Sequence, residues 1–228
     1  MEFDQKPRRE LLGHTVAAAI RDQILRGEVQ HGELLRLAPL AEKLDMSMTP
    51  VREALLLLAQ DGWVAHEPNR GFRVLPIERE NVIDTYFMWA VAEGELAARA
   101  ATRVKPEVIA SLRRTDAQLQ ALENHATEHA LELNARLHSE VNALAQAPKL
   151  LWFADLARRL VPLQFASAFH AVPGWASINR SGHGPIIDAI EAGDQNLARQ
   201  LMRSHFIDTC TLLVEWLDSM SFWTPTRK

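Results

Sequence analysis

Three histidines and one asparagine occupy positions from which a helical protein could hold a metal ion. Asn134 and His138 stand four residues apart in a segment expected to be helical, so their side chains share one face. His205 continues an apolar line through the last expected helix, and His183 stands at the start of the helix before it. Imidazole nitrogens from three helices, with one amide or carboxylate oxygen, suit zinc, nickel, iron or copper and leave positions open for a ligand.

The spacing alone leaves a second interpretation open. A single inward-facing histidine is more often a hydrogen-bonded core residue than a metal ligand. Leu137 and Val141 belong to the apolar line beside His138, and they direct His138 inward under either interpretation. The pattern therefore nominates the four residues without deciding between a metal centre and a polar core.

A second group of residues could contact nucleic acid. Arg52 lies in the first turn of a helix expected from Thr49, because Thr49 is a good N-cap and Pro50 a good first helical residue. An arginine there can reach a guanine edge with two hydrogen bonds, and the free backbone N–H groups of the same turn can bind phosphate. A surface ion pair is the alternative role for Arg52.

Two segments with β-strand character, 63–66 and 72–75, follow that helix and are joined by a five-residue loop. Arg70 and Gly71 stand at the tip of this hairpin, where the absence of a side chain at Gly71 would permit close approach to a minor groove. A helix that begins with an arginine and is followed by a β-hairpin is typical of a winged helix-turn-helix.

The remaining pattern predicts a mainly α protein with two domains. A winged helix-turn-helix is expected over residues 1–76, and an all-helical antiparallel bundle over residues 77–228. Segment 28–36 is expected to be a connector. Helices are expected at 10–26, 39–44, 49–60, 80–102, 106–124, 127–145, 148–169 with a kink at Pro162, 175–192 with a break at 182–185, and 194–219.

Composition limits the classes of function. The 228 residues are 47% hydrophobic, carry a formal net charge of −4 and include one cysteine, Cys210. One cysteine allows no intrachain disulfide, and no run reaches the ~18 apolar residues of a membrane span, so we expect a cytoplasmic protein without membrane partners. Bulk charge argues mildly against nucleic-acid binding, so any DNA contact must rely on a few placed positive groups.

Three sequence blocks resemble the winged helix-turn-helix of GntR-type bacterial repressors: SMTPVREAL at 47–55, DGWV at 61–64 and NRGFRV at 69–74. The resemblance implies a homodimer that binds a near-palindromic double-stranded operator. The residues it assigns to DNA are Ser47, Thr49, Arg52, Arg70 and Gly71. Met48 stands where the family usually has an arginine, which leaves the operator sequence and the affinity undetermined.

The second half resembles the FCD effector domain of the FadR-like branch. The motif residues are Asn134 and His138, then His183 followed by PIIDAIEAGD at 185–194, then His205. The resemblance implies that these four residues hold a divalent metal, zinc first, with nickel, iron or manganese as alternatives. Asn134 replaces the more usual aspartate, which removes one negative charge.

The same resemblance implies a small organic acid as effector. An arginine of the first bundle helix often pairs with the acid in this family, and that place aligns best with Trp89. Glu93, one turn further on, matches an acid common in the family. Arg136 and Arg180 are further candidates for binding a carboxylate, although either could be an ordinary surface arginine.

The expected function is a ligand-responsive transcription regulator, a repressor in the first instance, without catalytic residues. Two alternatives remain. A metal-dependent hydrolase would use the three histidines as a catalytic site, but no general base stands at an obvious position and no HExxH pattern occurs. An acyl-CoA-responsive regulator would lack the complete set of metal ligands.

Overall fold

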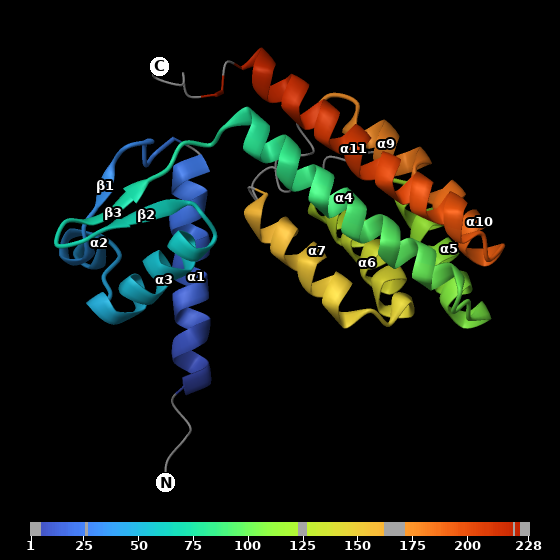
Figure 1. Ribbon diagram of the computed structural model, residues 1–228, viewed down its shortest axis with the longest axis horizontal. Coiled ribbons are helices and arrows are strands. Elements are labelled where there is room, and N and C mark those ends of the chain that lie inside the picture. Colours follow the sequence, from blue (N-terminus) through green and yellow to red (C-terminus); the bar gives the residue numbers. More distant parts are fainter. Residues whose placement is uncertain (1–5, 26, 123–126, 162–171, 221, 224–228) are drawn as a thin grey trace, which may run out of the picture. The chain divides into compact units, whose positions relative to one another are not determined.

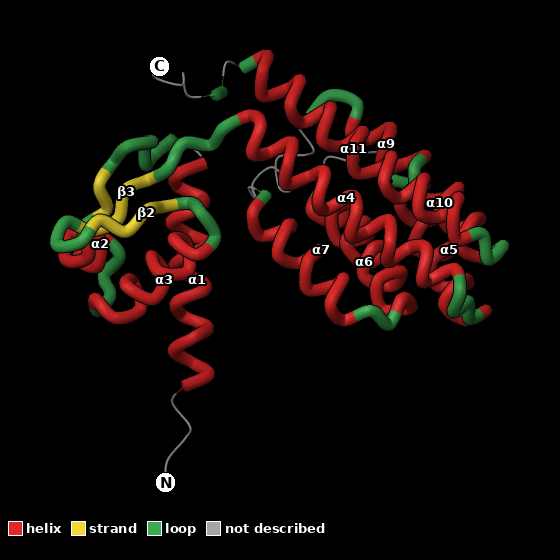
Figure 2. The backbone as a smooth tube through the Cα atoms, in the orientation of Figure 1, coloured by secondary structure: helices red, strands yellow, loops and turns green. Residues whose placement is uncertain are grey.

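The chain divides into two compact units, one ending at Glu78 and the other spanning Arg79–Trp223. The computed structural model describes residues 6–25, 27–122, 127–161, 172–220 and 222–223. Helices dominate both units, and the strands of the described residues all lie in the first unit (Figures 1 and 2). The predicted fold class, a winged helix-turn-helix followed by a helical domain, is confirmed.

The first unit packs three helices against a small antiparallel sheet. Its elements are α1 (Lys6–Leu25), β1 (Leu34–Leu35), α2 (Leu37–Lys43), α3 (Met48–Gln60), β2 (Val64–Glu67) and β3 (Gly71–Val74). Strand β3 lies between β1 and β2, and both pairings are antiparallel. The side chains of Ile20 from α1 and of Val51 and Leu55 from α3 are almost completely buried. This core fixes α3 and leaves its opposite face exposed.

Two details of the first unit differ from the sequence-based predictions. Segment 28–36 is more than a connector, because it contains β1, whose two residues are too few to give a periodic signal. Helix α3 begins at Met48, two residues before the expected first helical residue Pro50, so Ser47 rather than Thr49 is its N-cap. Pro50 then occupies the third helical position, where its missing N–H costs no hydrogen bond because the first turn has no carbonyl to receive one.

The second unit is a bundle of helices. Its elements are α4 (Arg79–Ala101), α5 (Pro106–Gln120), α6 (Glu128–Ala145), α7 (Pro148–Leu160), α9 (Trp175–Ser181), α10 (His183–Glu191) and α11 (Gln195–Ser219). Helices α4 and α11 run side by side over much of their length (Figure 1). Small residues permit this approach: a Cβ added to Gly94 would lie 2.4 Å from Cγ of Arg203.

Most helix boundaries of the bundle match the predictions to within two residues, with three differences. The helix expected to reach residue 124 ends at Gln120, and the helix expected to reach 169 is described only to Leu160. The kink predicted at Pro162 lies outside the described residues. The break predicted at 182–185 is confined to Gly182, and Pro185 falls inside the first turn of α10. In the parts of the chain that the structure describes, no helix is both long and apolar enough to span a membrane.

Candidate metal centre and DNA-contacting surface

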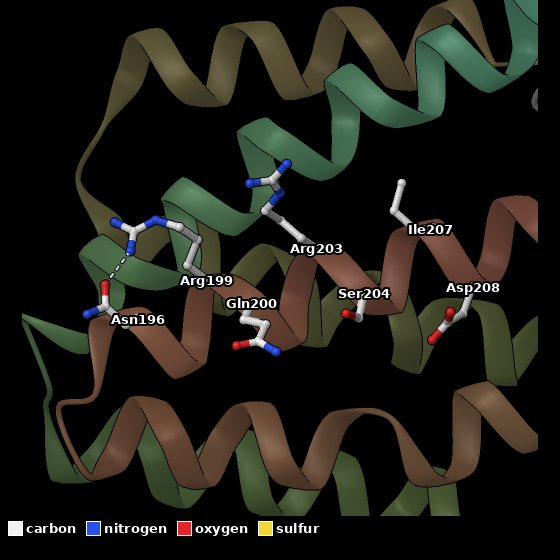
Figure 3. A pocket seen from close by; sticks show the side chains of 7 residues that line it. All are labelled: Asn196, Arg199, Gln200, Arg203, Ser204, Ile207 and Asp208. Atoms are coloured by element: carbon white, nitrogen blue, oxygen red, sulfur yellow. Dashed lines mark hydrogen bonds between the residues drawn. The ribbon is translucent and has the colours of Figure 1, made fainter.

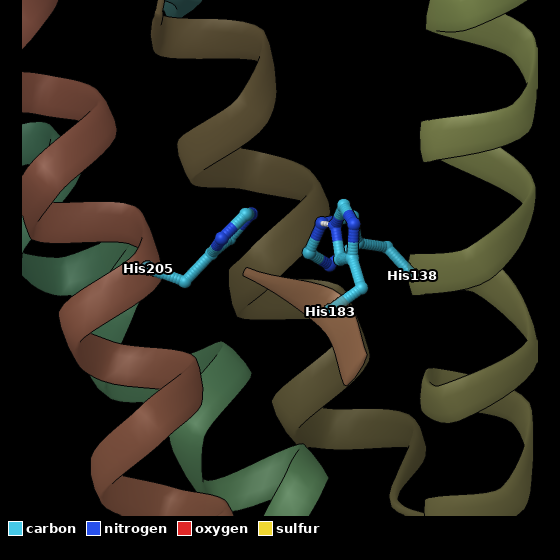
Figure 4. A group of neighbouring side chains, drawn as sticks. All are labelled: His138, His183 and His205. Atoms are coloured by element: carbon cyan, nitrogen blue, oxygen red, sulfur yellow. Dashed lines mark hydrogen bonds between the residues drawn. The ribbon is translucent and has the colours of Figure 1, made fainter. Parts of the chain in front are cut away.

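Three histidine rings meet inside the second unit. His138 comes from α6, His183 from the first residue of α10 and His205 from the middle of α11 (Figure 4). One ligand nitrogen from each lies within 4.8 Å of the others. The fold therefore gathers these three predicted residues into one cluster, which we call the histidine triad.

The spacing of two triad nitrogens suits a shared metal ion. Nε2 of His138 and Nε2 of His183 are 3.4 Å apart. Two nitrogens each about 2.1 Å from a zinc ion at the tetrahedral angle would be separated by about 3.4 Å. Ring centroids of the triad lie 4.7 to 5.4 Å apart, and the ring planes meet at angles of 37° to 77°, so the rings are tilted rather than stacked in parallel. The distance between these two nitrogens is therefore compatible with a shared zinc ion.

Burial keeps the triad in the form that binds metals. Desolvation lowers the pKa of His183 from 6.5 to about 4, although the carbonyl of Asn179 opposes the shift. Desolvation and the neighbouring His183 ring lower the pKa of His205 to about 3, and burial holds the pKa of His138 well below its usual value. All three rings are thus neutral near pH 7, with lone pairs available to a cation.

A backbone carbonyl orients one of the ligands. Nδ1 of His183 lies 3.1 Å from the carbonyl oxygen of Asn179, so Nδ1–H donates to it and Nε2 carries the lone pair. Such a hydrogen bond fixes the tautomer and the ring orientation of a ligating histidine. By contrast, Nδ1 of His138 and Nδ1 of His205 are buried without a hydrogen-bond partner among the described residues.

Gly182 makes room for the His205 ring. A Cβ at Gly182 would lie 2.6 Å from Nδ1 of His205, well inside contact distance. The glycine therefore serves the site through close packing, and its φ of −78° is one that any residue can adopt. Asn134, the fourth predicted ligand, is partly buried on α6 one turn before His138, on the same helix face.

Two of the four predicted effector residues lie close to the triad. The ring of Trp89 packs on Phe206 with centroids 4.8 Å apart, and Phe206 in turn packs on His138 at 5.3 Å. Nε1 of Trp89 donates a 3.0 Å hydrogen bond to Oε1 of Glu93. Glu93 is 4% exposed, and burial raises the pKa of its carboxyl to about 7 despite the hydrogen bonds it accepts from Trp89 and Asn142.

The two predicted arginines lie at exposed positions. The side chain of Arg136 is 58% exposed and forms an ion pair with Glu140, one turn along α6. Arg180 is exposed at the end of α9. The arrangement thus gives the surroundings of the triad an aromatic and acidic character rather than a basic one.

A separate groove of about 420 Å³ runs along α11, and none of the triad histidines lines it (Figure 3). Its two arginines are held by the fold: Arg199 pairs with Glu95 and donates to Oδ1 of Asn196, and Arg203 lies against Gly94. All the residues that line the groove belong to α11, so the groove is open to solvent and does not enclose a ligand. We therefore do not assign the effector to it.

The exposed face of α3 presents the predicted DNA-contacting residues. Ser47 and Thr49 are exposed at its start, and Arg52 is exposed as the fifth helical residue, in the second turn rather than in the first as predicted. No ion pair of Arg52 occurs among the described residues, which leaves its guanidinium available to a partner. Met48 and Leu56 continue the same face and are 58% and 52% exposed, although both are apolar. Apolar side chains on this face can contact thymine methyl groups but carry no charge to a phosphate.

The hairpin tip has a structural requirement that sequence reasoning missed. Gly71 has a φ of +130°, and a Cβ there would lie 2.4 Å from the carbonyl oxygen of Leu35 in β1. The glycine is therefore needed to close the sheet, whatever its role toward DNA. Arg70 is 66% exposed and pairs with Glu67 at 3.3 Å, while Glu67 is also bonded to Arg73 on the opposite strand.

Two buried asparagines next to the triad were also missed. Asn142 follows His138 by one turn of α6, and its Nδ2 donates to Glu93 at 3.3 Å. Asn179 is 1% exposed, and neither polar atom of its side chain has a partner among the described residues. The spacing of four residues from His138 and from His183 was visible in the sequence and could have indicated both.

Together, the winged helix and the separate helical bundle define the architecture of a DNA-binding regulator with a second, all-helical domain. Residues 12–74 match the family described as bacterial regulatory proteins, gntR family, and residues 84–208 match the FCD domain. The protein belongs to the GntR family of transcription regulators, in the group that carries an FCD domain. It is a regulator and not an enzyme, which sets the hydrolase alternative aside.

Named relatives support this assignment. A transcriptional regulator from an unstable DNA locus of Streptomyces ambofaciens is 31% identical, over 82% of this chain and 78% of its own. A probable repressor of a D-xylose utilization operon in Paenarthrobacter nicotinovorans is 28% identical, over 86% of this chain and 88% of its own. The solved structure of E. coli McbR/YncC shares the fold, with a TM-score of 0.65 and 21% identity over 90% of this chain and 98% of that one.

Proposed function

We propose that this regulator is a repressor whose helical domain binds a divalent metal and a small organic acid. Residues 1–76 would contact double-stranded operator DNA, and residues 77–228 would hold the metal, the effector and the dimer interface. The observation that carries the proposal is the buried histidine triad, neutral near pH 7, in a chain that also presents the exposed Arg52. Repressor names among the relatives favour repression over activation.

His138, His183 and His205 would hold the metal, with Asn134 as the fourth protein ligand. An ion bound there would take a carboxylate oxygen as a further ligand by expanding its coordination from four to five. The chain's own residues do the rest: the Asn179 carbonyl orients His183, Gly182 admits the His205 ring, and the aromatic rings of Trp89 and Phe206 exclude water.

An effector can change DNA binding only if it binds one arrangement of the dimer more tightly than another. The triad joins α6, α10 and α11, so an effector attached there contacts three helices at once. Apolar side chains exposed on α4 and α7 support a homodimer: Phe87, Met88, Trp152 and Phe153 are each about half exposed. Each winged helix-turn-helix unit offers few arginines to DNA, so two such units in a dimer would gain affinity by binding two half-sites together.

Two measurements test the proposal on the full-length protein. Metal analysis should find close to one zinc per chain, and His138→Ala should remove it, whereas His129→Ala, at an exposed position of the same helix, should not. A gel shift with the DNA upstream of the gene should give a specific, salt-sensitive complex that organic acids dissociate. Failure to form any specific complex, with or without candidate acids, would refute the function.

A further inference from the structure

Two side-chain oxygens, one on Glu93 and one on Asn142, lie buried without a hydrogen-bond partner among the described residues, and Asn142 stands one helical turn after His138. Oε1 of Glu93 accepts hydrogen bonds from Trp89 and Asn142, but Oε2 of Glu93 has no partner among the described residues. Oδ1 of Asn142 is likewise buried and without a partner. Glu93 is 4% and Asn142 is 8% exposed, so bulk water does not satisfy either oxygen. We call this pair of oxygens the acceptor pair.

The bonds already formed determine which partner is missing. The amide of Asn142 is oriented by its Nδ2–H bond to Glu93, so its oxygen cannot exchange places with its nitrogen without losing that bond. The N–H of Trp89 is likewise engaged by Glu93. A buried acceptor without a donor destabilises the folded state, and a charged acceptor does so more strongly. The two side chains are already joined by the 3.3 Å bond from Nδ2 of Asn142 to Oε1 of Glu93, so one group with two or more donors would satisfy the remaining oxygen of each.

A protonated amine meets that requirement better than other groups of an organic acid. It carries three donors and a positive charge, whereas a hydroxyl has one donor and a carboxylate has none. Aromatic rings add a second attraction: Trp89 packs against Tyr86 at 5.6 Å and against Phe206 at 4.8 Å, and such rings attract a cation. The charged groups of α7 that act on Glu93 are Asp155 and Arg158, which largely offset each other and lie 3.8 Å apart.

The geometry of α6 sets the length of the ligand. Asn142 stands four residues after His138, and four residues of α-helix rise about 6 Å. A molecule with a carboxylate at the triad and an amine at the acceptor pair must therefore span roughly that distance. A carboxylate and an amine separated by three or four methylene groups cover it.

We propose that the effector is an amino acid of this kind, whose carboxylate lies at the triad and whose ammonium group is bound by Glu93 and Asn142. This inference rests on the proposed effector function and specifies its chemical class. It replaces a general organic acid by a zwitterion, and it gives Glu93 the role of a specificity-determining residue. A simple dicarboxylate would instead place its second negative charge beside the buried carboxyl of Glu93, and it has no donor for either oxygen of the acceptor pair.

A matched series of acids tests the inference by calorimetry on the zinc-loaded full-length protein. Pentanoate, 5-aminopentanoate and glutarate have the same chain length and differ in the terminal group; butyrate, 4-aminobutyrate and succinate form a shorter set. The amino acid of at least one set should bind ten-fold or more tightly than both of its partners. Glu93→Gln should reduce that ratio to below three.

Glu95→Gln is the matched control, since it makes the same chemical change two residues along α4, where Glu95 pairs with Arg199 at the surface. It should keep the preference. The inference is overturned if no member of either set binds, if a dicarboxylate or an alkyl acid binds as tightly as the amino acid, or if Glu93→Gln keeps the preference. The wild-type ranking decides the matter even if Glu93→Gln does not fold.

Failure of the proposed function would look different. It would appear as protein without zinc or without a specific DNA complex, both measured on the same samples. If zinc were absent, the series would be repeated without metal. A Glu93-dependent preference for the amine would then still support the acceptor pair, and loss of the preference would overturn it. If only water bound to the acceptor pair, the three acids of each set would bind with equal affinity, and the inference would be overturned.

Discussion

Replacing His183 by glutamine should remove part of the acid sensitivity of the metal-free protein. The folded ring has a pKa of about 4, whereas the unfolded residue has the ordinary value of 6.5. Between these values the unfolded chain binds a proton that the folded chain does not, so stability falls as the pH falls. At pH 5, which is 1.5 pH units below the pKa of the unfolded residue, the free energy of unfolding should be lower than at pH 7.5 by about 2 kcal/mol through this residue.

The assay is urea unfolding followed by circular dichroism, with a chelator present, at pH 7.5 and pH 5. The free energy of unfolding of His183→Gln should fall by about 2 kcal/mol less than that of the wild type over this interval. His129→Gln changes an exposed histidine of α6 and should behave like the wild type. The reasoning is refuted if wild type and His183→Gln show the same pH dependence, because the ring would then not be buried and neutral.

Three other substitutions test separate parts of the structure. Arg52→Ala should weaken operator binding by about 1–3 kcal/mol in a gel shift, since it removes a base-contacting side chain from an exposed helix start. Gly182→Ala should lower zinc affinity at least ten-fold by competition with a chelating dye, because its Cβ would displace the His205 ring. Gly71→Ala should destabilise the first unit by more than 2 kcal/mol in thermal unfolding, since its Cβ would strike the β1 backbone.

Each of these has a matched control. Gln60→Ala changes an exposed residue at the far end of α3 and should leave operator binding within about two-fold. Gly184→Ala adds a Cβ whose nearest neighbour is 3.8 Å away, so zinc affinity should hold. Gly62→Ala has a positive φ but open space around it and should cost about 1 kcal/mol. If a control and its partner variant behaved alike, the contact invoked for the pair would be wrong.

Local signals in the sequence predicted the helices well, because each carries its own apolar period and its own breaks. Pro106 and Pro148 stand at the first helical positions of α5 and α7, as expected. Strand β1 was not predicted, because its two residues adopt an extended conformation by pairing with β3, and this pairing leaves no pattern in the local sequence. The three histidines were found by helical spacing and resemblance together.

The surroundings of the triad were harder to predict. Whether Arg136 faces the interior depends on which side of α6 packs against α4 and α5, and its spacing from His138 does not decide this. The importance of Asn142 follows from Glu93, 49 residues away, and only the folded bundle brings them within 3.3 Å. Sequence reasoning identified residues that could bind a metal, but not the neighbours that orient them or leave an oxygen without a donor.

The break between α9 and α10 has a consequence for how this family can vary. In an unbroken helix, the carbonyl of Asn179 would receive the backbone N–H of residue 183; here it receives the side chain of that same residue, His183. The orientation of the His183 ring therefore depends on the four-residue spacing between Asn179 and His183. A single-residue insertion or deletion at Gly182 would rotate the start of α10 by about 100° and turn the ring away from its partners. Length changes should therefore be tolerated in the loops around this turn and not within it, even where every histidine is retained.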